Sequence, residues 1–157
     1  MTKIVVVALM LLGVYFIFFQ DKLPSQLVFD GYTLEKKSKQ LFERADGKFA
    51  VYKYADKSQK HFLVLVVSED GSAVPDEAIK QFYIKRLKNQ QNMVSVPSQQ
   101  GRYLGYKRNK PRGMAQVYLT YAPTIKAVIV YTRSSSQEAL NKGESEQVFL
   151  NLERYTF

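Results

Sequence analysis

An uninterrupted apolar run at residues 4–19 constrains this chain of 157 residues more than any other stretch. No side chain in the run is charged, and its one polar group is the hydroxyl of Tyr15. Such a run is typical of a cleaved secretion signal or of a membrane anchor. The residues that follow it are therefore treated as a separate folding unit.

We expect an uncleaved anchor, because the residues after the run do not suit a signal peptidase. Phe19, Gln20 and Asp21 offer no pair of small residues for a cleavage site. A helix over residues 4–19 would be about 24 Å long. Local thinning of the bilayer would cover the difference from a hydrocarbon core of about 30 Å.

The charges that flank the run predict its orientation. Lys3 precedes the run, whereas Asp21 and Lys22 cancel each other after it. Because positive charge is enriched on the cytoplasmic side of membrane spans, we expect the amino terminus in the cytoplasm. The predicted location is a single-pass membrane protein with an extracytoplasmic domain, which would be periplasmic in a Gram-negative cell.

The predicted domain organisation has three parts: a transmembrane anchor at 1–20, a tether at 21–26 and one domain at 27–157. The domain is long enough to bury a core without disulfides, and the chain has no cysteine. Strand-like segments outnumber helical ones, and the connections are short. This pattern favours an α+β fold class, with a mainly antiparallel sheet and helices packed on it.

Two apolar segments, 61–68 and 127–131, predict central strands, because strands covered on both faces lose the alternation of polar and apolar residues. The dipeptide Asp46-Gly47 predicts a hairpin turn. The complete set of predicted strands is 32–37, 39–45, 48–54, 61–68, 92–96, 102–108, 114–121 and 126–133.

Helices are predicted at 75–89 and 137–154. Pro75 suits the first position of a helix, because its missing N–H costs no hydrogen bond there. Ser134–Ser136 are expected to cap the second helix. The apolar stripe that we expect to lie on the sheet consists of Ile79, Phe82, Tyr83 and Leu87.

Three features occur in a recognisable order: the 75–89 helix, the step Leu104-Gly105 that enters a strand meander, and the carboxy-terminal segment 148–157. In this order the chain resembles the PsbP/Mog1-like α–β–α sandwich family, over about residues 30–157. The resemblance implies a non-enzymatic role in binding or assembly, although a fold alone does not determine function.

Few residues could carry catalysis. His61 is the single histidine, it begins an apolar strand, and no serine stands in a Gly-x-Ser-x-Gly motif. Two carboxylate pairs, at 69–70 and 76–77, are expected at a turn and at a helix start, where solvent and the helix dipole account for them. We therefore predict no enzyme activity, no cofactor and no metal site.

The charges are segregated by sign. The chain has 23 Lys and Arg residues and 14 Asp and Glu residues, yet no acid lies between residues 78 and 137. A basic face that meets an acidic partner would explain this pattern, and a solvated loop is the alternative. The bases of this acid-free segment are Lys80, Lys85, Arg86, Lys88, Arg102, Lys107, Arg108, Lys110, Arg112, Lys126 and Arg133.

The predicted function is a non-catalytic, membrane-anchored binding or assembly module of a membrane or envelope complex. Its partners would be a protein or anionic lipid headgroups. The alternative is a membrane-anchored domain that binds nucleic acid or another polyanion, because bases interleaved with tyrosines suit single strands. Nucleic acid is the less expected partner, because a domain that faces outward from the cell seldom meets it. The predicted partner-binding residues are Arg102, Tyr103, Tyr106, Lys107, Arg108, Lys110 and Arg112.

Overall fold

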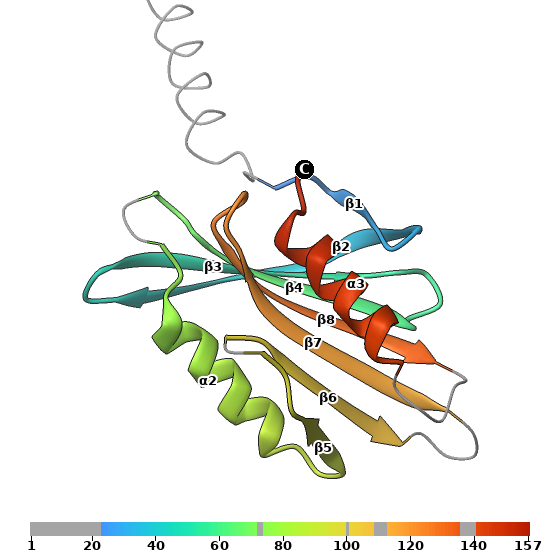
Figure 1. Ribbon diagram of the computed structural model, residues 1–157. Helices are drawn as coiled ribbons and strands as arrows, with labels where there is room; N and C mark the ends of the chain where they lie inside the picture. The colour runs from blue at the N-terminus through green and yellow to red at the C-terminus, as the bar shows by residue number, and fades with distance from the viewer. Residues whose placement is uncertain (1–22, 72–73, 100, 109–112, 136–140) are drawn as a thin grey trace, which may run out of the picture.

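The structure is a computed structural model that describes residues 23–71, 74–99, 101–108, 113–135 and 141–157. These residues form one eight-stranded sheet and two helices (Figure 1). Neighbouring strands are antiparallel, in the order β1-β2-β3-β4-β8-β7-β6-β5. The elements are β1 (Gln26–Phe29), β2 (Tyr32–Arg44), β3 (Gly47–Ala55), β4 (His61–Ser68), α2 (Glu77–Lys88), β5 (Met93–Val96), β6 (Tyr103–Arg108), β7 (Met114–Ala122), β8 (Ala127–Ser135) and α3 (Lys142–Glu153).

The two helices cover opposite faces of the sheet. Val130 of β8 packs in a cluster with Ile84 of α2, whereas its neighbour Ile129 packs in a cluster with Phe149 of α3. Successive side chains of a strand point to opposite faces, so the central strands are buried on both sides. The core therefore has two apolar layers, one against each helix.

Local sequence explains where α2 begins and which side it buries. The Asp76 carboxylate caps the helix by accepting a hydrogen bond from the Ile79 N–H at 3.1 Å. Pro75 thus precedes the cap and does not occupy the first helical position. Ile79 and Leu87 are buried as predicted, but Phe82 is 60% exposed and the unpredicted Ile84 is buried. Tyr83 packs against both clusters on the α2 face of the sheet, so the predicted stripe is confirmed except at Phe82.

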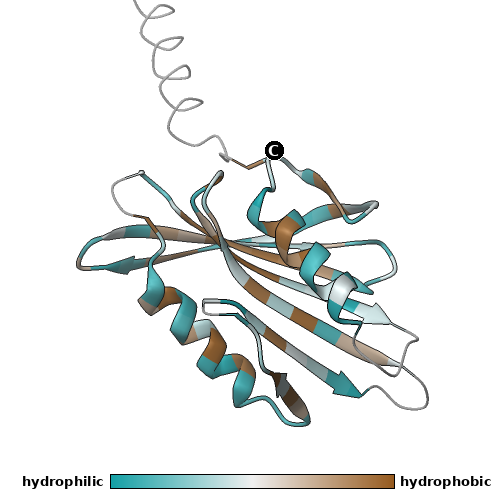
Figure 2. Ribbon diagram, in the orientation of Figure 1, coloured by the Kyte–Doolittle hydropathy of each residue, from teal (hydrophilic) through white to brown (hydrophobic). Residues whose placement is uncertain are grey.

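α3 is shorter than the predicted helix at 137–154. Asn141 caps it by accepting hydrogen bonds from the N–H groups of Gly143 and Glu144. Ser134 and Ser135 belong to β8, so the predicted serine cap is wrong. Figure 2 shows hydrophobic and hydrophilic residues alternating along α3, as expected for a helix that lies on a sheet.

The strand pattern is close to the one predicted. The hairpin at Asp46-Gly47 is confirmed, since Arg44 pairs with Gly47 where β2 meets β3. β4 and β8 pair with each other at the centre of the sheet. The segments predicted separately at 32–37 and 39–45 form the single strand β2, whose register shifts between Lys36 and Ser38. A bulge lets the ladder continue through the position at which the two predicted segments were separated.

The predicted fold class and membrane location are wrong. The described residues are mostly β structure, and none of their helices is long and apolar enough to cross a membrane. α2 and α3 have 12 residues each, or about 18 Å, which falls short of a hydrocarbon core of about 30 Å. A single-pass anchor is therefore not supported, and residues 1–20, to which it was assigned, lie outside the described residues.

The orientation of α2 leads to a stability prediction. Leu87→Ala should lower the free energy of unfolding by about 2–4 kcal/mol, because Leu87 is 8% exposed. Phe82→Ala, on the exposed side of the same helix, is the control and should change it by less than about 0.5 kcal/mol. Urea unfolding followed by circular dichroism measures both, and equal losses would contradict the observed orientation of the helix.

Candidate functional site

The structure does not gather the predicted partner-binding residues on one surface. Alternation along β6 places Tyr103 and Lys107 on the α2 face of the sheet, and Tyr106 and Arg108 on the α3 face. Tyr103 is buried, and its hydroxyl lies 3.1 Å from the hydroxyl of Ser95. The remaining predicted residues, Lys110 and Arg112, lie outside the described residues.

Arg102, the first predicted site residue, is committed to contacts inside the domain. Its guanidinium donates to both carboxylate oxygens of Glu153, at 2.6 and 2.8 Å. A third nitrogen donates to Glu146 at 2.8 Å, and the group lies 5.1 Å from the ring centre of Phe149. Both carboxylates belong to α3. Arg102 directly precedes β6, so its contacts hold α3 against β6. We call Arg102, Glu146 and Glu153 the Arg102 clamp.

Arg133 is the second base of the acid-free segment that pairs with α3. It donates to Glu144 at 2.7 Å, and on the sheet it donates to Gln116 at 2.8 Å and to the Tyr118 hydroxyl at 3.3 Å. The acid-free segment contains no carboxylates of its own, and carboxylates of α3 thus pair with its Arg102 and Arg133. Part of the charge segregation is therefore internal pairing between segments far apart in sequence.

The bases of α2 have a different environment. Lys85, Arg86 and Lys88 are exposed, and within the described part of the chain no carboxylate lies at ion-pair distance from any of them. Their position in the last turn is favourable on its own account, because the carboxyl end of a helix carries partial negative charge.

An exposed aromatic ring lies among these bases. Phe82 precedes Lys85 and Arg86 by three and four residues, the spacing that places side chains on one helix face. Lys107 lies on the same side of the sheet, opposite Met93, which packs in the cluster with Leu87. We define the α2 basic surface as Phe82, Lys85, Arg86, Lys88 and Lys107.

His61 belongs to the interior rather than to a surface site. Its ring stacks on that of Tyr32, and its Nδ1 lies 2.9 Å from the hydroxyl of Tyr131. The Tyr131 hydroxyl in turn donates to Asp30 at 3.2 Å. Burial lowers the pKa of His61. These contacts connect the turn after β1 to the centre of the sheet.

Within the described ranges, the geometry thus contains the open α2 basic surface and the internal networks of Arg102 and Arg133. Among the residues that the structure describes, no three His, Asp or Glu side chains are grouped to hold a metal ion. No family model matches the chain, and no curated protein is significantly similar to it. The resemblance to the PsbP/Mog1-like family stays a prediction.

The Arg102 clamp leads to a double-mutant prediction. Arg102→Gln should lower the free energy of unfolding by about 2–3 kcal/mol, because it removes charge-assisted hydrogen bonds from a side chain that is 11% exposed. Glu153→Gln in the Arg102→Gln background should cost much less than in the wild type, since the pair acts as a unit. Glu146→Gln is the control and should cost less than about 1 kcal/mol as a half-exposed partner. The clamp is contradicted if urea unfolding shows that the double variant loses the sum of the unfolding free energies lost by the two single variants.

The same pair predicts a dependence of stability on pH. The Arg102 guanidinium lowers the pKa of Glu153 from its ordinary value of 4.5 by hydrogen bonding to the carboxylate. A lowered folded-state pKa contributes stability that is complete above the unfolded-state value and is lost as pH falls through the folded-state value. The stability gap between the wild type and Glu153→Gln should therefore be constant near neutral pH and shrink on acidification below 4.5. A gap of constant size in acid would contradict the assignment.

Proposed function

We propose that the domain is a non-catalytic binding module whose α2 basic surface meets an acidic protein partner. The observation that carries the proposal is the division of the bases in the acid-free segment. Arg102 and Arg133 are paired within the fold, whereas Lys85, Arg86 and Lys88 face solvent on one helix. The unpaired bases are thus the ones available to a partner.

Physical chemistry favours an acidic occupant for this surface. Like charges on neighbouring turns of a helix repel one another weakly in water, and a carboxylate-rich partner relieves that repulsion. Charge complementarity also speeds the diffusional encounter. Phe82, which is 60% exposed, supplies an aromatic group of the kind that anchors protein interfaces.

A protein partner fits better than a nucleic acid. Stacking of single strands needs several exposed rings along a basic groove. Tyr103 is buried under α2, and Tyr106 lies on the other face of the sheet from the α2 basic surface. Phe82 is thus the one ring within this surface, which suits a single apolar anchor.

Binding to poly-glutamate tests the proposal. Replacing Lys85, Arg86 and Lys88 by Gln should weaken binding by about tenfold, from three exposed contacts of about 0.5 kcal/mol each. The matched control replaces Lys48, Lys57 and Lys60, which are exposed bases outside the α2 basic surface, by Gln. Fluorescence anisotropy at low and at physiological salt measures each dissociation constant, and the wild-type affinity should fall with salt.

The control and a second ligand make the result decisive. The control variant should bind poly-glutamate as the wild type does, and an equal loss in both variants would contradict the proposal by showing that net charge alone matters. Single-stranded oligothymidine serves as the comparison ligand. Tighter binding of oligothymidine than of poly-glutamate, lost with the α2 bases, would replace the proposed partner with a nucleic acid.

A further inference from the structure

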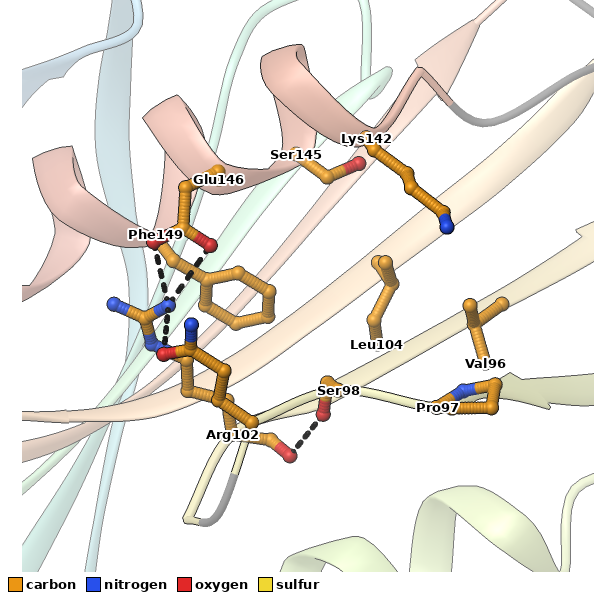
Figure 3. Close-up of a pocket in the computed structure, with 10 residues that line it drawn as sticks. Val96, Pro97, Ser98, Arg102, Leu104, Lys142, Ser145, Glu146 and Phe149 are labelled. Carbon is orange, nitrogen blue, oxygen red and sulfur yellow. Dashed lines mark hydrogen bonds and ion pairs between the residues drawn. The ribbon is translucent and has the colours of Figure 1, made fainter.

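A groove on the α3 face of the sheet has a cavity volume of about 500 Å³. Its apolar surface is formed by Val96 at the end of β5, Leu104 of β6 and Phe149 of α3 (Figure 3). Pro97 continues this surface along the segment after β5. The volume lies within the range of about 300–1,000 Å³ that is usual for small-molecule sites.

One end of the groove offers two hydrogen-bond donors. Ser145 is 5% exposed and lines the groove. Lys142 lies one turn earlier on α3, and Figure 3 shows its side chain extending toward Leu104 and Val96. No carboxylate among the described residues pairs with its ammonium group. The Ser145 hydroxyl and the Lys142 ammonium can each donate a hydrogen bond to a ligand oxygen, and the positive charge of Lys142 complements a carboxylate.

The other end of the groove is already neutralised. Glu146 lines it, but Arg102 donates to both of its carboxylate oxygens, at 2.8 and 3.0 Å. The charge of Glu146 therefore opposes an anion less than an unpaired carboxylate would. The amino terminus of α3, with its partial positive charge, adds to the attraction at the end formed by Lys142 and Ser145.

We propose that this groove binds a small amphiphilic monocarboxylate. The carboxylate would accept hydrogen bonds from the Lys142 ammonium and the Ser145 hydroxyl, and an aliphatic or aryl body would lie on Val96, Leu104 and Phe149. The site is on the opposite face of the sheet from the α2 basic surface. The inference therefore stands independently of the proposed protein partner.

The test is an NMR titration of the full chain with sodium octanoate, kept below the concentration at which it forms micelles. The readouts are the methyl signals of Val96 and Leu104 and the backbone amide signal of Ser145, all of which belong to the groove. Octyltrimethylammonium has the same tail and the opposite charge, and acetate lacks the tail. Octanoate should give saturable shifts of these signals, whereas the two comparison probes should bind at least about tenfold more weakly.

Two variants test the polar end, with a third as control. Lys142→Gln and Ser145→Ala should each raise the dissociation constant of octanoate by about tenfold, or about 1.4 kcal/mol, with circular dichroism used to verify folding. Lys48→Gln removes the same charge from an exposed position outside the groove and should leave the constant unchanged. The proposal is overturned if octanoate leaves the groove signals unshifted, if octyltrimethylammonium binds equally well, or if both groove variants bind as the wild type does.

Discussion

The Arg102 clamp is the interaction on which the α3 side of the structure depends. Arg102 comes from the segment just before β6, and Glu146 and Glu153 come from a helix that follows it by more than forty residues. Thr120 of β7 also donates to Glu153, at 2.8 Å, so both β7 and the segment before β6 are joined to α3. A mostly buried guanidinium is stable only when its donors are matched. The two acids of α3 and the ring of Phe149 supply that match and hold the helix on the sheet.

The two faces of the sheet carry different candidate binding sites. Because both faces of the central strands are apolar, each needs a helix, and each helix presents a different outer chemistry. The outer side of α2 carries unpaired bases around Phe82. α3 uses its acids for internal pairing and leaves Lys142 and Ser145 beside a groove. A binding surface and a small-molecule site can therefore exist on opposite faces of one domain.

The sequence predicted the strands better than the site, for physical reasons. Apolar runs and the Asp46-Gly47 turn are local signals, and they located β4, β8 and the β2–β3 hairpin. On α2, Phe82 was wrongly predicted to face the sheet and Ile84 was overlooked, because both are apolar and burial rather than hydropathy distinguishes them. The pairing of Arg102 depends on residues distant in sequence. Its one local trace is the seven-residue spacing of Glu146 and Glu153, which places both on one face of a helix.

The central claim is that Arg102 and Arg133 of the acid-free segment are paired inside the fold, whereas Lys85, Arg86 and Lys88 form an open surface. Arginine-selective labelling with phenylglyoxal, read by mass spectrometry with and without poly-glutamate, tests it within a single chain. The account predicts that exposed Arg86 is modified readily and is protected by poly-glutamate, whereas Arg102 is modified slowly in both conditions, since its guanidinium is held by Glu146 and Glu153. Rapid modification of Arg102, or no protection of Arg86, would contradict the account.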